Sequence, residues 1–323
     1  MKGVLALLRS VRDSRRVETD GGTVEERSTV RRWLDSDIVQ SAPFWFPPFL
    51  LMGFFVYAAI GWNFFLSLTS YSGFGDPDYS DLGLENYTTL LSDPQFWEAT
   101  RNTVVLLVVF TVACLAIGLV LALLLDRKIR FERSFRTIYL LPFALSFIVT
   151  AQFWRWMYNV NNGIINQVIG VFGLGPYNWL GDPRLVLGAV IFALVWQFSG
   201  YTMVIYLAAL RSIPTDQYEA ARVDGASTIR MYWRVIIPQL RAAMVSASVT
   251  LVLFALKAFD FLYATFDGYR PRKGADILAT FMVRESFGKS EWAYGSAIAL
   301  VLFAVSLAVI APYLYNQYKQ GNL

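Results

Sequence analysis

The stretch Glu219-Ala-Ala-Arg-Val-Asp-Gly-Ala226, continued by Val235-Ile-Ile-Pro238, is a polar and charged segment set between two long apolar segments of the chain. Its residues read in order as a helix, a glycine stop, a second helix and a proline. A helical hairpin in such a connection is suited to be a docking surface for another protein. The stretch therefore predicts an interaction surface between two membrane-embedded segments.

The signals for the hairpin's helices are local. Pro214 fits the first turn of a helix that starts near Thr215, because a proline there sacrifices no hydrogen bond. Gly225 supplies the left-handed residue that ends this helix. Ser227 or Thr228 can then cap the second helix. We expect this hairpin to lie along the membrane surface.

The composition of the whole chain indicates that its solvent is lipid. Of 323 residues, 56% are hydrophobic and only 16% are charged, and the mean hydropathy is +0.44. A membrane-crossing helix needs about 20 apolar residues. Six segments meet this requirement: Phe44–Leu68, Val104–Leu125, Ile138–Tyr158, Leu185–Leu210, Ala242–Leu262 and Ala293–Tyr315. Backbone groups in lipid must bond to one another, so we expect an all-α membrane protein with six continuous helices.

The distribution of Lys and Arg predicts the orientation. Basic residues are frequent in the N-terminal tail, between the second and third spans, and in the loop 211–241, so we expect these segments, and both termini, in the cytoplasm. The loops 69–103 and 159–184 hold few and would face outward. Residues 264–292 run against this rule, with Arg270, Arg272, Lys273, Arg284 and Lys289. The expected organisation is a tail 1–43, a six-helix transmembrane domain 44–315 that includes loop 211–241, and a tail 316–323.

The sequence lacks the residues that several functional classes require. The chain has no histidine, which removes the common catalytic triads, histidine zinc sites and histidine proton relays. The single cysteine, Cys114, lies in mid-span and reads as a small core residue. No GxxxxGK[ST] phosphate loop occurs. We expect no catalytic residue, no metal and no bound cofactor, so that any ATP and Mg would be bound by a partner. The basic excess suits anionic lipid rather than nucleic acid.

The opening stretch resembles the EAA motif of permease subunits in ATP-binding-cassette (ABC) importers. Glu219, Ala220, Ala221 and Gly225 match in place, and Pro238 closes the motif. Val235 and Ile237 depart conservatively from the usual isoleucine and leucine. The resemblance to the family extends to Gly83–Tyr87, Phe96-Trp97, Asn102-Thr103 and Gly163–Asn166. Two later stretches, Phe259–Tyr263 and Tyr294–Ala297, resemble its carbohydrate-uptake subgroup, to which the maltose-type larger-partner subunits belong. Residues Phe266–Pro271 replace the usual Thr-Gly-Gly-Pro turn.

This resemblance implies a type I importer permease fold, in which the hairpin is a cytoplasmic coupling helix. It implies a permease subunit that imports a sugar or related polyol and works with a second permease subunit, two ATPase subunits and an extracytoplasmic solute-binding protein. Its location would be the cytoplasmic membrane. The residues that the resemblance assigns to ATPase coupling are Glu219, Ala220, Ala221, Asp224, Gly225 and Pro238. Glu219 would pair with a basic group of the ATPase, and the small residues would allow close seating.

Residues of the substrate pathway are sought among polar and aromatic side chains within spans. Gln197 and Tyr201 lie four apart, on one helical face, and Trp196 is adjacent. An amide beside an aromatic ring suits a sugar. Alternatively, Gln197 bonds to a neighbouring helix while Tyr201 packs. Lys257 and Asp260, near an outer end, can pair or reach the interface.

Other functions remain open. The hairpin could rest on lipid, with Arg222, Arg230 and Arg234 at headgroups. The importer could carry another small polar solute, such as glycerol phosphate. A secondary transporter would show inverted repeats and paired intramembrane acids, which the sequence does not display. A membrane enzyme would need a catalytic cluster.

Overall fold

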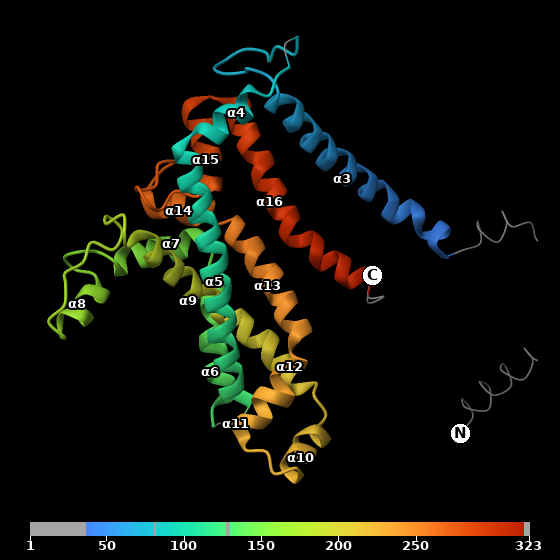
Figure 1. Ribbon diagram of the computed structural model, residues 1–323, viewed down its shortest axis with the longest axis vertical. Coiled ribbons are helices and arrows are strands. Elements are labelled where there is room, and N and C mark those ends of the chain that lie inside the picture. The colour runs from blue at the N-terminus through green and yellow to red at the C-terminus, as the bar shows by residue number, and fades with distance from the viewer. Residues whose placement is uncertain (1–36, 81, 127–129, 320–323) are drawn as a thin grey trace, which may run out of the picture. The chain divides into compact units, whose positions relative to one another are not determined.

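The computed structural model describes residues 37–80, 82–126 and 130–319. Over these ranges the chain is helical and contains no strand. The predicted tail 1–43 lies outside the described residues up to residue 36, and so do residues 320–323 of the predicted tail 316–323. The elements shown in Figure 1 are, in order, α3 (Asp37–Ser67), α4 (Glu85–Ser92), α5 (Pro94–Asp126), α6 (Glu132–Leu140), η1 (Leu141–Ala144), α7 (Phe147–Met157), α8 (Ile164–Gly170), α9 (Val186–Arg211), α10 (Thr215–Val223), α11 (Thr228–Met231), η2 (Tyr232–Ile236), α12 (Ile237–Gln239), α13 (Arg241–Leu256), α14 (Phe259–Phe266), α15 (Leu278–Val283), η3 (Arg284–Gly288) and α16 (Trp292–Lys319).

The chain divides into two compact units, Met1–Ala59 and Ile60–Leu323. The described part of the first unit is the beginning of α3, and the second unit holds everything that follows. The all-α membrane fold is confirmed. Four helices are long and apolar enough to cross a membrane, α3, α5, α9 and α16, and the number rises to six if each of two bent helix pairs counts as one span.

The third predicted span is not the continuous helix that we expected. Between α6 and α7 the chain bends by 102°. Pro142 lies in the 3-10 turn η1, and Leu145 after it is extended. Ser146 then restarts the helix, because its hydroxyl accepts a hydrogen bond from the Val149 N–H at 3.3 Å. A proline followed by a capping serine is the physical cause of the break.

The fifth predicted span, Ala242–Leu262, is also interrupted. Helix α13 ends at Leu256, and Lys257 and Ala258 separate it from α14. Upstream, the segment Thr228–Gln239 meets α13 at a bend of 64°. The helix runs through Pro238 to Gln239, one residue beyond the predicted end.

The core of the second unit forms where α5 and α9 pack along each other (Figure 1). Their contact is close: a Cβ added at Gly118 would lie 2.2 Å from the Thr202 hydroxyl oxygen. That hydroxyl donates to the Cys114 carbonyl at 2.8 Å. Cys114 is completely buried at this contact, which confirms its interpretation as a core residue. Small residues thus bring two spans together, as is common where hydrocarbon supplies little driving force.

Candidate functional site

The hairpin α10–α11 lies at one end of α5, and α4 and α15 lie at the other (Figure 1). Helix α10 begins at Thr215, as predicted. Gly225 follows it in the left-handed conformation, with φ of 71°. Ser227, rather than Thr228, caps α11 by accepting a hydrogen bond from the Arg230 N–H at 3.4 Å. The predicted local structure of the hairpin is therefore present.

The two alanines of the motif face opposite ways. Ala220 is exposed, as are Glu219 and Asp224. Ala221, in contrast, is only 7% exposed. It belongs to a cluster of buried side chains formed with Ala122, Leu125, Met203, Tyr206, Leu207, Leu210, Met231, Ile236 and Leu240. The expectation that both alanines lie at a docking surface is wrong for Ala221, because the inner face of α10 packs on the ends of α5 and α9.

Three large apolar side chains on the hairpin are exposed instead of buried. Val223 is 87% exposed, Ile229 74% and Trp233 68%. They flank the turn at Gly225 and were not identified from the sequence. Their positions in the sequence could have indicated this exposure. The three residues interrupt a polar loop without the spacing of a buried helical face, so the sequence predicts no core into which they would pack. Exposed apolar side chains next to exposed carboxylates suit a protein contact.

Polar contacts join the two arms of the hairpin to each other, and another joins α9 to α6. The Gln239 side-chain amide lies 2.5 Å from the Gln217 amide oxygen and donates to the Val235 carbonyl at 2.8 Å. The Arg211 guanidinium at the end of α9 pairs with Glu132 of α6 at 2.5 Å. The hairpin meets α5 and α9 through the buried cluster around Ala221 rather than through these polar contacts.

Tyr218 of α10 lies beside the second arm of the hairpin. Its ring centroid is 6.4 Å from that of Tyr232. Burial, followed by the effects of the Asp126 carboxylate and of Tyr232, raises the pKa of Tyr218 to about 12. Tyr218 therefore stays neutral at physiological pH, and it packs as an aromatic residue between the two arms of the hairpin.

The candidate pathway residues lie within α9. Gln197 is 2% exposed, and its amide donates to the Leu145 carbonyl at 2.7 Å, at the break before α7. This bond to a neighbouring element is the alternative that the sequence left open. Trp196 and Tyr201 are half-buried. Tyr201 stacks on Phe143 at 5.0 Å and Trp196 stacks on Phe153 at 5.7 Å. Their role in a pathway stays a prediction.

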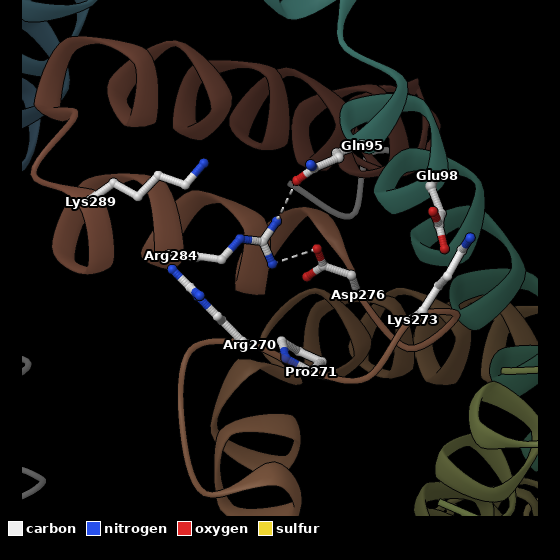
Figure 2. A pocket seen from close by; sticks show the side chains of 8 residues that line it. All are labelled: Gln95, Glu98, Arg270, Pro271, Lys273, Asp276, Arg284 and Lys289. Carbon is white, nitrogen blue, oxygen red and sulfur yellow. Dashed lines mark hydrogen bonds and ion pairs between the residues drawn. The ribbon is translucent and has the colours of Figure 1, made fainter. Parts of the chain in front are cut away.

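A polar cavity of about 520 Å³ lies at the end of α5 opposite the hairpin. Figure 2 shows the side chains that line it, which come from α5, from the loop after α14, and from η3 and its end: Gln95, Glu98, Arg270, Pro271, Lys273, Asp276, Arg284 and Lys289. Arg270 and Lys273 have no ion pair among the side chains that the structure describes. The cavity can therefore accept an anionic or hydrogen-bonding group.

Arg284 organises one wall of this cavity. Its side chain is 9% exposed and lies 2.6 Å from the Asp276 carboxylate and 3.4 Å from that of Glu285. A further contact of 3.5 Å joins it to the Gln95 amide oxygen (Figure 2). Burial raises the pKa of Asp276, while the Thr280 hydroxyl and Arg284 oppose that rise by bonding to the carboxylate.

The same contacts bear on the segment 264–292, whose basic residues run against the predicted orientation. Arg284 is paired with Asp276, and Lys289 is paired with Glu285 at 2.7 Å. Part of the positive charge is thus neutralised within the segment itself. Counting Lys and Arg along the sequence does not register this compensation.

Comparison with known proteins matches residues 114–321 to the family described as binding-protein-dependent transport system inner membrane component. The chain is 59% identical over 296 residues to the xylose/arabinose import permease protein XacH of Haloferax volcanii, covering 92% of this chain and 93% of that protein. It is 32% identical over 238 residues to the trehalose/maltose transport system permease protein MalF of Thermococcus litoralis, covering 74% and 80%.

Among solved structures, the fold is similar to that of a chain in a bacterial alginate ABC transporter bound to an alginate pentasaccharide-loaded periplasmic protein. The TM-score is 0.68 at 20% identity, over 90% of this chain and 94% of that chain. The six-segment pattern, the hairpin after the fourth segment and these matches agree, and the chain belongs to the family of binding-protein-dependent transport system inner membrane components.

Proposed function

We propose that this chain is the permease subunit of an ATP-driven importer for sugars, with pentoses as the leading substrates. The observation that carries the proposal is the 59% identity, over 92% of the chain, to a xylose/arabinose import permease. Relatives named for trehalose and maltose and for sulfoquinovosyl glycerol widen the class to glycosides. A relative named for osmoprotective compounds, 32% identical over 71% of the chain, favours small polyol-like solutes as a second candidate class.

The partners of the proposed importer are a second permease subunit, two ATPase subunits and an external solute-binding protein. The chain has no phosphate loop of its own, so ATP and Mg are bound by the ATPase subunits. The distribution of Lys and Arg supports an orientation in which both termini and the hairpin lie in the cytoplasm. The cavity around Arg284 then faces the external binding protein.

The hairpin couples ATP hydrolysis to transport in this proposal. Glu219, Ala220 and Asp224 are exposed on it and form the docking surface, together with the exposed Val223 and Ile229. Gly225 and Pro238 shape the hairpin. Ala221 acts from the inside, where it holds α10 against the cluster of Tyr206, Met231 and Leu240 described above. When the ATPase dimer closes, the hairpin moves as one piece with the cytoplasmic ends of α5 and α9.

A reconstituted transport assay tests the proposal. The chain is purified with a second permease subunit and an ATPase from the same genome and placed in proteoliposomes with a solute-binding protein from that genome. We expect ATP-dependent uptake of labelled xylose or arabinose, and none from vesicles that lack this chain. A panel with trehalose, glycerol and glycerol phosphate separates the solute classes. Uptake by this chain alone, without ATPase, would contradict the proposal.

A further inference from the structure

Helices α7 and α14 belong to different predicted spans and pack side by side. Two polar contacts join them. The Gln152 side-chain amide donates to the Ala264 carbonyl at 2.9 Å. Arg155 of α7 forms an ion pair with Asp267, the residue that caps the end of α14. The two helices therefore present one continuous surface.

That surface carries polar and charged side chains that point away from the core. On α7 the exposed side chains are Gln152, Arg155 and Trp156, beside the apolar Ile148, Val149 and Phe153. On α14 and the break before it they are Lys257, Asp260 and Tyr263, spaced three residues apart on one side of the helix. These three residues, with Gln152, Arg155 and Trp156, are called the α7–α14 seam below.

Lys257 and Asp260 have no partner in the described part of the chain. The sequence allowed their side chains to pair with each other, but no ion pair or hydrogen bond joins either side chain to another described group. Both fall inside the predicted fifth span, and Arg155 falls inside the third. The seam thus brings exposed charges from two spans to the same surface.

Contact with lipid is unfavourable for such a surface. Lys, Arg and Asp in membrane helices almost always face protein or water, and the cost of exposing one to lipid is about 2.5–3.5 kcal/mol at the middle of the helix and falls toward its ends, where Lys257 and Asp260 lie. The exposed side chains of α5 offer a contrast, since Val104, Val108, Val112 and Val120 are all apolar. A face of that kind suits hydrocarbon, whereas the seam does not.

A dry contact with another subunit is also unfavourable. Each charge would need its own partner there, because a buried charge left alone costs about 3–5 kcal/mol. Water avoids this cost by hydrating Lys257 and Asp260 separately. The absence of a partner for either charge within the described residues therefore favours an aqueous neighbour.

We infer that the α7–α14 seam lines the aqueous route through which a polyhydroxylated solute passes. The inference rests on the proposed function and assigns the solute-facing residues. Gln152, Lys257 and Asp260 can exchange hydrogen bonds with hydroxyl groups, and the rings of Trp156 and Tyr263 offer flat apolar faces to C–H groups. Trp196 lies one layer behind, stacked on Phe153 of α7.

Thiol labelling of the assembled transporter tests this inference. The native Cys114 is completely buried and gives little background. Lys257→Cys and Tyr263→Cys place thiols on the seam, and Val108→Cys places one on the apolar face of α5, about as far from the predicted outer end of its span as Lys257 is from the end of the fifth. The probe is a positively charged, membrane-impermeant methanethiosulfonate. Because a thiol must ionise in water to react, we expect the seam cysteines to react at least about tenfold faster than Val108→Cys.

Two outcomes would overturn the inference. In one, the seam cysteines react quickly in the isolated chain but as slowly as Val108→Cys in the assembled complex, which means that another subunit seals the seam. In the other, they react slowly in both preparations. Two different seam positions guard against a single variant that fails to assemble, which size-exclusion chromatography detects.

A transport readout follows from the same variants. Once Tyr263→Cys is fully labelled, the adduct occupies the route, so sugar uptake should fall while labelled Val108→Cys retains it. Unchanged uptake after complete labelling contradicts the inference. The labelling rates can be measured even in a complex that does not transport sugar, and uptake by the unmodified complex is measured separately. A failure of the proposed function is therefore distinguishable from a failure of the inference about the seam.

Discussion

The Arg284 guanidinium lies 2.6 Å from the Asp276 carboxylate, and both groups are largely buried in the wall of a polar cavity. The pair links the loop before α15 to the π-helical turn η3 that follows it. Since η3 leads into α16, this one contact helps to place the start of the last span. The same pair helps to neutralise a segment whose sequence is unusually basic for its predicted side of the membrane.

Arg284→Met should destabilise the protein strongly, because it leaves the buried carboxylate without its partner at a cost of about 3–5 kcal/mol. Arg272→Met is the matched control, since Arg272 is exposed in the same segment and makes no described ion pair. Thermal unfolding of the purified complex measures the difference. Adding Asp276→Leu to Arg284→Met should restore part of the loss. Equal stability of the two single variants would show that the pair contributes nothing.

Gly200→Ala should prevent the normal packing of α9. A Cβ at this position would lie 1.8 Å from the Tyr139 carbonyl oxygen, so the helices must separate, at a cost of about 1–3 kcal/mol or more. Gly188→Ala in the same helix meets nothing within 4 Å and should stabilise the helix by roughly 0.5–1 kcal/mol. Thermal unfolding compares the two. A Gly200→Ala protein as stable as Gly188→Ala would refute the close contact.

Asn166→Ala should loosen the loop between α7 and α9. The Asn166 side chain bonds to the Tyr177 carbonyl at 2.9 Å, to its N–H at 3.1 Å and to the Trp179 indole at 2.9 Å. Leaving such groups unsatisfied costs about 1–3 kcal/mol. Limited proteolysis should cut the variant faster in this loop, whereas the neighbouring exposed amide variant Gln167→Ala should behave as wild type. If this loop were cut equally slowly in both variants, Asn166 would have no organising role.

Gln197→Leu separates packing from solute contact in α9. If Gln197 serves mainly to satisfy the Leu145 carbonyl, its loss lowers the free energy of unfolding by about 1–3 kcal/mol and leaves the KM for sugar uptake unchanged. Unfolding and uptake kinetics are measured on the same preparation. A raised KM with unchanged stability would instead assign Gln197 to the pathway.

The sequence was sufficient for features that depend on local signals. Hydropathy located the membrane segments, and Gly225 and Ser227 take the conformations expected of them. The break before α7 had its own signals in Pro142 and Ser146, but the apolar run around them favoured one continuous helix.

Features that depend on contacts between distant parts of the chain could not be predicted from the sequence. The burial of Ala221 follows from which face of α10 meets α5 and α9, and the pairing of Arg284 with Asp276 joins positions eight apart across a helix junction. The seam is another case. Its residues form a surface only because α7 and α14, more than a hundred residues apart, lie together.

The central claim is that the hairpin couples ATP hydrolysis to sugar movement through Glu219. The most direct test measures ATP hydrolysis and sugar uptake in the same proteoliposomes for wild type, Glu219→Lys and the control Asp216→Lys, which alters an exposed carboxylate one turn earlier in α10. Removing one partner of a largely buried ion pair costs about 3–5 kcal/mol, enough to uncouple the docked hairpin. We predict that Glu219→Lys assembles and hydrolyses ATP but does not take up sugar, while Asp216→Lys does both. Wild-type uptake by Glu219→Lys would contradict the account.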